Sequence, residues 1–320
     1  MNIIETNQLT KRYSGRNRGP TGAHPALDAL TLEIAPAQFF GLIGPDGAGK
    51  TTALRILSTV LLPTSGSARV SGLDVRSQAE QVRKLIGYMP QAFSLYPDLS
   101  VLENLEFFAD IHHLSREKKK ERMAFMLEFT RLENFIHSRA SVLSGGMKKK
   151  LALACAMIHE PQILLLDEPS TGVDPISRRE LWEILARVVQ RGVTVVVSTP
   201  YMDEAERCHQ IAILYEGTLL TSGSPRGLQK DLPFQILEVN ARPRKDMRRI
   251  AAATENLLEW RPVGDRLRLA IPAGAPAAQT TLHSLDERMR QENLDVKSLH
   301  LTRSTLEDVF VYLVNRKRGK

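Results

Sequence analysis

The sequence is poor in the residues that mark cross-linked, metal-bound or membrane-spanning folds. Its two cysteines, Cys155 and Cys208, lie far apart and form no Cys-x-x-Cys pair, which argues against a zinc site or a disulfide framework and fits a reducing cytoplasm. Apolar runs such as Ile163–Leu166 have the length of a strand and fall far short of a bilayer span. Because no basic segment precedes an apolar one near Met1, we expect no secretory signal.

Aromatic residues are scarce as well, at 6% of the 320 residues, and they do not interleave with the basic clusters. Those clusters are Lys118–Lys120, Lys148–Lys150, Arg242–Arg249 and Arg316–Lys320, in a chain of formal net charge +7. Surfaces that bind single-stranded nucleic acid combine cations with stacking rings, so we expect no nucleic-acid partner. The clusters are interpreted as solvated surface, with contact to anionic lipid headgroups as the alternative.

What the sequence does contain is the patterning of a mixed α/β fold. Alternation of apolar and polar residues predicts an antiparallel sheet within residues 1–75, from the segments Ile3–Leu9, Leu27–Ala35 and Ala68–Val70. Phe39–Ile43 is apolar apart from one glycine, as a buried strand is, and a helix over Lys50–Val60 is expected after a glycine-rich turn. The Gly-, Arg- and Pro-rich stretch between Arg12 and Pro25 is predicted to be a loop.

The middle of the chain changes from helices to a parallel sheet. Residues 92–140 have helical spacing throughout, with one apolar face from Val101, Leu102, Leu105 and Phe108 and another from Met123, Met126, Leu127 and Phe129. Strands are expected at Ile163–Leu166 and Val193–Ser198, separated by a helix over Ser177–Gln190. A strand, a helix and a strand in that order imply parallel pairing with a right-handed crossover.

A second domain is predicted to begin at Pro233. Its segments follow the order β-α-β-β-α-β, at Phe234–Val239, Arg248–Ala253, Leu257–Trp260, Arg266–Ile271, Leu282–Gln291 and Val296–Leu301. We therefore divide the chain into a domain of residues 1–232, with a helical subdomain at about residues 92–158, and a small C-terminal α+β accessory module of residues 233–320.

The strongest motif is a phosphate-binding turn between the buried strand and the following helix. The run Gly44-Pro45-Asp46-Gly47-Ala48-Gly49-Lys50-Thr51 fits G-x-x-x-x-G-K-[ST], and Thr52 follows it. Glycines let successive backbone N–H groups surround an anion, and the N-terminus of the helix adds a favourable dipole. Lys50 is expected to reach the β- and γ-phosphates of ATP, and Thr51 to place its hydroxyl on Mg²⁺. A turn that merely joins strand to helix is the alternative.

An acidic pair, Asp167 and Glu168, follows the apolar strand Ile163–Leu166. The carboxyl end of such a strand is where open α/β sheets bind ligands. We predict that Asp167 holds Mg²⁺ through water and that Glu168 accepts a proton from the attacking water. Taken alone, Asp-Glu-Pro could equally be an ordinary exit from a strand, but the phosphate-binding turn favours the functional interpretation.

A third segment, Leu143-Ser144-Gly145-Gly146-Met147, carries a family resemblance. It is similar to the L-S-G-G-Q signature of the ATP-binding cassette (ABC) family, with methionine at the fifth place, and it precedes the acidic pair as it does in that family. There the segment holds the γ-phosphate of the ATP on the facing subunit, so the resemblance implies a head-to-tail dimer. A helix N-terminus suits that task, although a lone Ser-Gly-Gly could simply cap a helix over Met147–His159.

The resemblance implies a P-loop NTPase fold with a RecA-like core, an antiparallel β subdomain and the helical subdomain. Gln91 matches the glutamine that touches Mg²⁺ and the attacking water, and Asp174 matches the loop that crosses the dimer interface. Tyr13 follows the first strand, where the family stacks an aromatic ring on adenine; ordinary surface is the alternative. The implied cofactors are ATP and Mg²⁺, with the metal held by Thr51, Gln91 and Asp167.

One position departs from the family. Pro200 stands where the family has a histidine that contacts the γ-phosphate and keeps the water and the base in line. Proline offers no side-chain donor and no backbone N–H, and we see no geometric reason for His209 to replace that histidine. The combination of Gly44-Pro45-Asp46-Gly47 with a missing histidine is similar to the first of two ATP-binding halves in tandem multidrug-type exporter ATPases.

The segment Ser304–Phe310 is similar to the closing segment of ATPases that serve ABC-2 type exporters. The resemblance therefore implies an ATP-hydrolysing subunit, peripheral at the cytoplasmic face of the inner or plasma membrane. Its implied partners are a second ABC domain, identical or different, and ABC-2 type membrane subunits.

Other interpretations remain open at this point. One is a nucleotide-binding subunit with little hydrolysis, because of Pro200. Another is a soluble ABC protein of translation or DNA repair, which predicts two cassettes or a long heptad insert, and neither is present. A small-molecule P-loop kinase would lack the segment Leu143–Met147.

Overall fold

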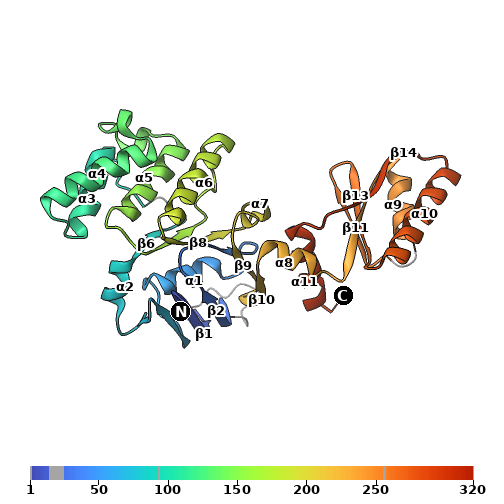
Figure 1. Cartoon of the computed structure of the whole chain (residues 1–320), viewed down its shortest axis with the longest axis horizontal. Coiled ribbons are helices and arrows are strands. Elements are labelled where there is room, and N and C mark those ends of the chain that lie inside the picture. Colours follow the sequence, from blue (N-terminus) through green and yellow to red (C-terminus); the bar gives the residue numbers. More distant parts are fainter. Residues whose placement is uncertain (1, 14–24, 93, 255–256, 320) are drawn as a thin grey trace. The chain divides into compact units, whose positions relative to one another are not determined.

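The computed structural model describes residues 2–13, 25–92, 94–254 and 257–319 (Figure 1). The chain separates into two compact units, Met1–Pro225 and Arg226–Lys320, and each is considered by itself below. None of the helices in the described part combines the length and the apolar character that a membrane crossing requires. The loop predicted between Arg12 and Pro25 falls almost wholly outside the described residues.

The first unit begins with an antiparallel sheet of four strands, as predicted. Its strands are β1 (Ile4–Lys11), β2 (Leu27–Ile34), β4 (Ser65–Val70) and β5 (Leu73–Asp74), in the order β2-β1-β4-β5. In β2 the buried residues Leu30, Leu32 and Ile34 alternate with exposed ones. Alternation directs successive side chains to opposite faces of the sheet, so one face of β2 meets the core.

A second sheet of six strands forms the centre of the same unit. Its strands are β3 (Phe39–Ile43), β6 (Ile86–Met89), β7 (Ile163–Asp167), β8 (Thr194–Thr199), β9 (Gln210–Tyr215) and β10 (Thr218–Gly223). The order is β10-β9-β3-β8-β7-β6, and all neighbours except β10 and β9 pair in parallel. The predicted parallel pairing is therefore confirmed. The carboxyl ends of β3, β7 and β8 open on one edge, where α/β sheets place their ligands.

Helices cover both faces of this central sheet (Figure 1). The helix α1 (Lys50–Leu57) packs against β7 and β8 on one side and against β4 of the antiparallel sheet on the other. Its residues Leu54, Ile56 and Leu57 belong to the core that joins the two sheets. The helices α6 (Pro175–Gln190) and α7 (Met202–Ala205) also pack on the central sheet, while α2 (Ala79–Leu85) leads into β6.

A bundle of three helices makes up the predicted helical subdomain. These are α3 (Val101–Ile111), α4 (Arg116–Thr130) and α5 (Gly145–Met157), which pack on one another (Figure 1). The expectation of helical spacing throughout residues 92–140 is wrong for the segment before α3 and for the segment after α4, where Glu133–Phe135 forms only a short 3-10 turn. In the first of these segments Ser100 caps α3 in a capping box with Glu103, and the buried Asn104 amide donates to the carbonyls of Tyr96 and Leu99. These polar bonds satisfy a loop where the apolar spacing predicted a helix.

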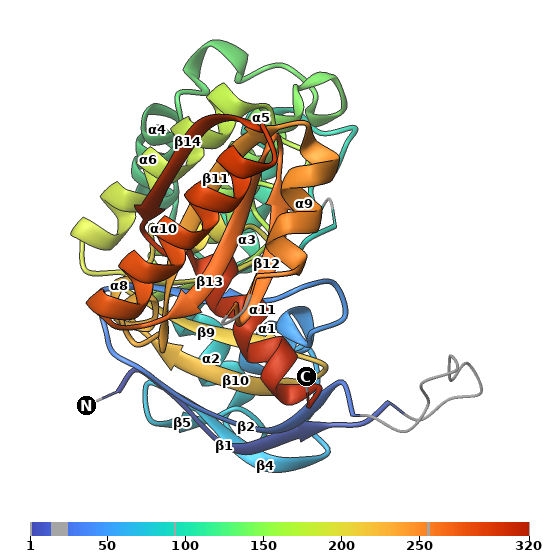
Figure 2. The same cartoon turned by 90° about the vertical axis from the view of Figure 1, so that its right-hand side faces the viewer.

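The second unit has a four-stranded antiparallel sheet in the order β12-β13-β11-β14. The strands are β11 (Phe234–Arg242), β12 (Glu259–Val263), β13 (Arg266–Pro272) and β14 (Asp295–Thr302), with α8 (Pro225–Lys230) before them. The helices α9 (Arg244–Ala252) and α10 (Ala275–Gln291) lie on one face (Figure 2). The elements β11 to β14 follow the order β-α-β-β-α-β and have the strand arrangement of a ferredoxin-like sandwich. A final helix, α11 (Leu306–Lys317), has no counterpart among the elements expected from the sequence.

Charged side chains fasten α11 to the other face of that sheet. Alternation along β11 buries Leu237 and Val239 beneath the helices and turns Glu238 to the opposite face. There Arg268 lies 2.8 Å from Asp308 of α11, and Arg261 lies 2.6 Å from the same carboxylate. The module is therefore closed by an apolar layer on one face and by arginine–carboxylate pairs on the other.

Candidate nucleotide-binding site

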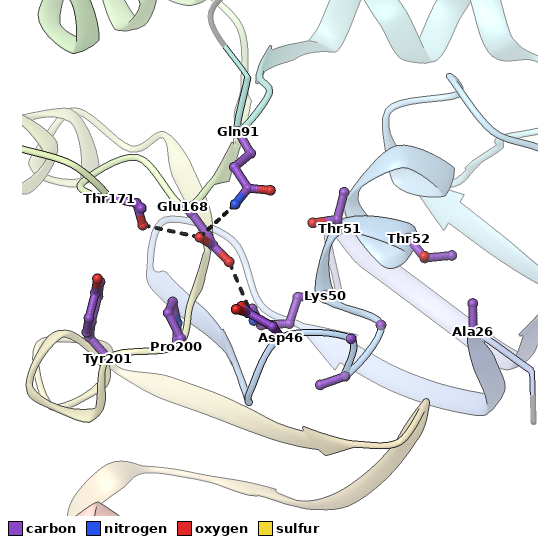
Figure 3. A pocket seen from close by; sticks show the side chains of 13 residues that line it. Ala26, Asp46, Lys50, Thr51, Thr52, Gln91, Glu168, Thr171, Pro200 and Tyr201 are labelled. Carbon is purple, nitrogen blue, oxygen red and sulfur yellow. Dashed lines mark hydrogen bonds and ion pairs between the residues drawn. The ribbon is translucent and has the colours of Figure 1, made fainter. Parts of the chain in front are cut away.

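A pocket of about 470 Å³ opens at the carboxyl edge of the central sheet (Figure 3). Four segments form most of its wall, and each one follows a parallel strand: β3, β6, β7 or β8. The lining residues are Ala26, Asp46–Thr52, Gln91, Glu168, Thr171, Pro200 and Tyr201. The structure therefore brings the phosphate-binding turn, the glutamine and the acidic pair of the sequence analysis to one place.

The turn between β3 and α1 holds its lysine in a fixed position. Lys50 is only 4% exposed, and its Nζ donates to the carbonyls of Gly44 at 2.8 Å and Pro45 at 3.1 Å. Gly49 has φ 102°, and a Cβ there would come within 2.5 Å of the Ala26 carbonyl oxygen. Only glycine at this position lets the turn pack against Ala26. The turn thereby places the Lys50 ammonium beside the N-terminus of α1.

The buried carboxylate of Asp167 lies at the end of β7, beside Thr51 of the phosphate-binding turn. Its Oδ1 accepts hydrogen bonds from Thr51 Oγ1 at 3.0 Å and from Ser198 Oγ at 2.6 Å. Its Oδ2 is buried and has no hydrogen-bond partner among the residues that the structure describes. A buried oxygen left unpaired costs about 1–3 kcal/mol, so this atom is suited to bind a ligand. The hydroxyl, carboxylate and amide oxygens of Thr51, Asp167 and Gln91 are of the kind that Mg²⁺ prefers.

Glu168 is held in an unusual backbone conformation beside them. Its φ of 48° lies in the left-handed region, which costs a non-glycine residue about 1–3 kcal/mol. Its N–H donates to Ser198 Oγ at 3.0 Å, while its Oε2 accepts from Gln91 Nε2 at 3.0 Å and from Thr171 Oγ1 at 3.2 Å (Figure 3). Its Oε1 lies 3.6 Å from Lys50 Nζ. Several bonds therefore direct this carboxylate into the pocket.

A second carboxylate joins the segments that follow β7 and β8. Glu204 is fully buried and accepts hydrogen bonds from Ser170 after β7 and, at 2.6 Å, from Thr199 Oγ1 at the end of β8. Arg178 of α6 lies 2.8 Å from Glu204 through its Nε and 2.6 Å from Asp203. Two walls of the pocket are therefore fixed to the same group.

The signature-like segment lies outside this pocket. Ser144 is the N-cap of α5 and accepts a hydrogen bond from the Met147 N–H at 3.2 Å. Ser144 and Gly145 are exposed, whereas Gly146 is buried and a Cβ there would come within 2.4 Å of Ser177. None of the three lines the pocket. The structure therefore does not bring this helix N-terminus to the chain's own phosphate-binding turn.

The remaining residues singled out from the sequence divide into two groups. Pro200 lines the pocket, and Tyr13, 55% exposed, places its hydroxyl 3.4 Å from Thr52 Oγ1 near the rim. His209 lies elsewhere, because its Nδ1 accepts a hydrogen bond from the Phe39 N–H at the amino end of β3. Asp174 caps α6 through the N–H groups of Ile176 and Ser177. His209 therefore cannot stand in for a side chain at the carboxyl edge.

Four residues of the site were missed by sequence reasoning: Ala26, Thr171, Ser198 and Tyr201. A signal existed for two of them. Ser198 ends a strand that was predicted to lie parallel to the strand of Asp167, and Tyr201 follows that same strand. Because parallel strands open on one edge, both positions were candidates. Nothing in the sequence marks Ala26 or Thr171.

Comparison with known proteins gives the family. The sequence profile of the family described as "ABC transporter" matches residues 27–171. The probable multidrug ABC transporter ATP-binding protein YbhF of Escherichia coli K12 is 45% identical over 230 residues, which are 72% of this chain and 39% of YbhF. This chain thus spans only 39% of the length of that relative. The Nod factor export ATP-binding protein I of Cupriavidus metallidurans is 36% identical over 317 residues, 98% of each chain.

Solved structures agree with this result. The dimeric, post-hydrolysis structure of the ATP-binding cassette MJ0796 bound to ADP and Pi has 27% identity and a TM-score of 0.63, covering 69% of this chain and 98% of that one. An ATP-binding subunit of an ABC transporter has the same identity and TM-score, covering 71% and 92%. The fold is thus that of a P-loop NTPase, as the sequence predicted. The chain belongs to the ABC transporter family, as one of its ATP-binding ATPase cassettes.

Proposed function

We propose that this chain binds and hydrolyses ATP as the nucleotide-binding subunit of an ABC exporter, coupling ATP-driven dimerisation to transport by separate membrane subunits. The observation that carries the proposal is that Lys50, Thr51 and Glu168 line one pocket, with Asp167 hydrogen-bonded to Thr51. The names of the relatives, a multidrug transporter protein and a Nod factor export protein, support the exporter class.

The phosphates of ATP would lie in the turn Gly44–Thr52. Its backbone N–H groups and the N-terminus of α1 attract the anion, and Lys50 is close enough to the loop to exchange its carbonyl partners for phosphate oxygens. Tyr13, next to Thr52, would stack on the adenine ring. Such stacking contributes about 1–3 kcal/mol.

Mg²⁺ would be held by Thr51, Asp167 and Gln91 together with phosphate oxygens. The unpaired Oδ2 of Asp167 supports this assignment, since a buried carboxylate oxygen is a suitable ligand or partner of a metal-bound water. When bound, the ion neutralises charge that develops on the transferred phosphoryl group.

Glu168 would accept the proton of the water that attacks the γ-phosphate. Gln91 and Thr171 both donate to its Oε2 and fix the direction of the carboxylate. A positioned general base contributes about 10²–10⁴-fold to a rate. The strained backbone at Glu168 is the kind of local cost that enzymes retain at a reacting centre.

The exposed Ser144–Gly146 segment would bind the γ-phosphate of a facing ABC domain. A helix N-terminus with free N–H groups suits that role, and the segment does not reach its own chain's pocket. The partner domain would be a second copy or a different chain, and the membrane partners would be of the ABC-2 type. The assembly would lie at the cytoplasmic face of the inner or plasma membrane, with residues 1–232 as the cassette and residues 233–320 as an accessory module.

A second candidate function is nucleotide binding with slow hydrolysis at this chain's own site. Pro200 favours it, because proline lines the pocket and offers no donor where the family carries a histidine. The chain would then be the weaker of two ATP-binding halves, and its exposed signature would complete the stronger site of the other half.

Release of phosphate from Mg·ATP by the wild-type chain and by Glu168→Gln tests the main proposal. We expect the variant to bind ATP as tightly as the wild type and to lose most of its turnover. A variant that turns over at the wild-type rate would contradict the assignment of Glu168 as the base. A wild type that is slow from the start would favour the second candidate.

A further inference from the structure

Tyr201 is a part of the pocket wall that neither the sequence analysis nor the proposed mechanism uses. It follows Pro200 directly and lines the pocket, with 41% of its surface exposed. Its backbone N–H donates to Thr199 Oγ1 at 3.0 Å, and that hydroxyl in turn donates to the buried Glu204. The main chain of Tyr201 is therefore tied to the fixed end of β8.

The ring of Tyr201 is held as well as its backbone. The guanidinium carbon of Arg178 lies 5.1 Å from the ring centroid, a cation–π distance. Arg178 is itself fixed by Asp203 and Glu204. The Arg178 guanidinium covers one face of the Tyr201 ring and so favours the orientation in which the ring lines the pocket.

The hydroxyl of Tyr201 has no hydrogen bond among the residues that the structure describes. Two other polar groups of the wall, Gln91 and Thr171, are already engaged, since both donate to Glu168. In Figure 3, Tyr201 stands across the pocket from Ala26 and Thr52, on the side of Glu168 and Thr171. With adenine expected beside Thr52, the Tyr201 side is the one that the terminal phosphate of ATP would occupy.

We propose that the Tyr201 hydroxyl donates a hydrogen bond to the terminal phosphate of ATP and so makes this pocket prefer ATP to ADP. The proposal rests on the proposed ATP binding and adds the group that reads the γ-phosphate. A hydroxyl donor facing phosphate forms a charge-assisted hydrogen bond. This hydrogen bond would recognise the terminal phosphate, but it would not align the attacking water with the base as a histidine does. One site could therefore bind ATP tightly and hydrolyse it slowly.

Binding of AMP-PNP and of ADP, each with Mg²⁺, to the full chain tests this role by calorimetry. We expect Tyr201→Phe to weaken AMP-PNP about tenfold, the lower end of the range for a hydrogen bond to a charged group, and to leave ADP within twofold. Tyr96→Phe is the matched control. Tyr96 is 46% exposed, has no hydrogen bond to its hydroxyl among the described residues and does not line the pocket, so neither affinity should change.

Three outcomes are informative. A selective loss of AMP-PNP affinity in Tyr201→Phe supports the proposal. Unchanged AMP-PNP affinity would overturn it, and so would equal losses for both nucleotides in a variant whose thermal unfolding midpoint matches that of the wild type. A wild-type chain that binds neither nucleotide would instead contradict the proposed function itself, and the two failures are therefore distinguishable.

Discussion

The pocket of the first unit and the α11 face of the sheet in the second unit treat buried charge in opposite ways. In Met1–Pro225 the buried groups Lys50 and Glu168 line an open pocket. Asp167 is hydrogen-bonded to Thr51 of the pocket wall, and one of its oxygens has no partner among the described residues. In Arg226–Lys320 the buried carboxylates Glu238 and Asp308 are both paired with arginines. A buried charge without full pairing is costly, so the first arrangement points to a ligand and the second to structure.

The pKa of Asp308 also shows that its buried charge is stabilised within the second unit. Burial alone would raise the pKa of its carboxyl, but hydrogen bonds from Thr305, Arg261 and Arg268 outweigh it and lower the pKa. Because the ionised form is favoured in the fold, this pair stabilises the module above the ordinary aspartate pKa and weakens as the pH falls below it. The charge of Asp308 is thus satisfied inside the module and needs no substrate.

Net charge separates the units too. Residues 226–320 contain 18 lysines and arginines and 12 aspartates and glutamates, out of 43 and 36 in the whole chain. Residues 226–320, the second compact unit, therefore carry six of the seven net positive charges. A positive field of this kind acts on solubility and on association with anions.

The largest effect is expected at Lys50. Lys50→Ala removes a buried ammonium that, under the proposed function, would face two phosphates, and we expect ATP affinity to fall about hundredfold, or roughly 3 kcal/mol. Calorimetry measures it directly. Lys84→Ala, an exposed lysine on α2, is the control and should bind as the wild type does. If Lys50→Ala bound ATP as tightly as the wild type, the buried charge at the pocket would not serve ligand binding, and the contrast with the paired charges of the second unit would no longer hold.

A charge placed on the exposed signature should separate binding from assembly. A Cβ at Gly145 would meet only the Gly172 carbonyl oxygen, at 3.4 Å, so Gly145→Asp fits sterically. Its carboxylate would repel a phosphate on a facing domain, and we expect turnover and ATP-driven dimerisation to fall more than tenfold. Monomer affinity for ATP should hardly change.

Gly145→Ala is the control for that experiment. It adds the same Cβ without charge and should retain most of the dimerisation seen by light scattering. If Gly145→Asp weakened monomer binding as much as Lys50→Ala does, the segment would belong to its own chain's pocket, against the geometry described above.

The proline at the carboxyl edge gives a smaller and opposite effect. We expect Pro200→His to raise turnover about tenfold, part of the factor of about 10²–10⁴ that a positioned acid–base group provides. Pro200→Ala restores the backbone N–H without a side-chain donor and should stay slow. Brisk wild-type turnover that Glu168→Gln abolishes would show that another group already does this work.

The smallest effect concerns the module. The core clusters of the two units share no residue, so a chain that ends at Leu232 should fold and bind ATP within twofold of the full chain. Circular dichroism and calorimetry check both points. A chain ending at Pro225 is the companion, since that is where the compact units divide. Aggregation of the longer form alone would show that the predicted boundary at Leu232 is misplaced.

Much of the fold followed from patterns that are local in the sequence. Alternation in β2, the unbroken apolar run of β7 and the glycine-rich turn before Lys50 each depend on a few neighbouring residues, and these elements were predicted closely. The segment before α3 was not, because its structure depends on Asn104 satisfying carbonyls of the loop. Side-chain hydrogen bonds decide here between a loop and a helix, and the spacing of apolar residues carries no information about them.

The candidate site shows the same limit. Lys50, Asp167 and Glu168 stand in motifs and could be named in advance, whereas Ser198 and Tyr201 acquire their positions from a strand pairing that joins distant parts of the chain. Arg178 and Glu204 are further removed still, since their relation to the pocket exists only through packing of α6 and α7. Residues that contact a site only through other residues are therefore the hardest to predict from the sequence.

The shared carboxylate of Glu204 has a consequence for motion. Because Ser170 and Thr199 donate to the same buried group, the segment after β7 and the segment after β8 cannot shift independently without leaving a charge unpaired. Arg178 extends the connection to α6, whose first turn is capped by Asp174. A displacement of the Asp174 end of α6 would therefore be transmitted through Glu204 to both segments, the one that contains Glu168 and the one that contains Tyr201.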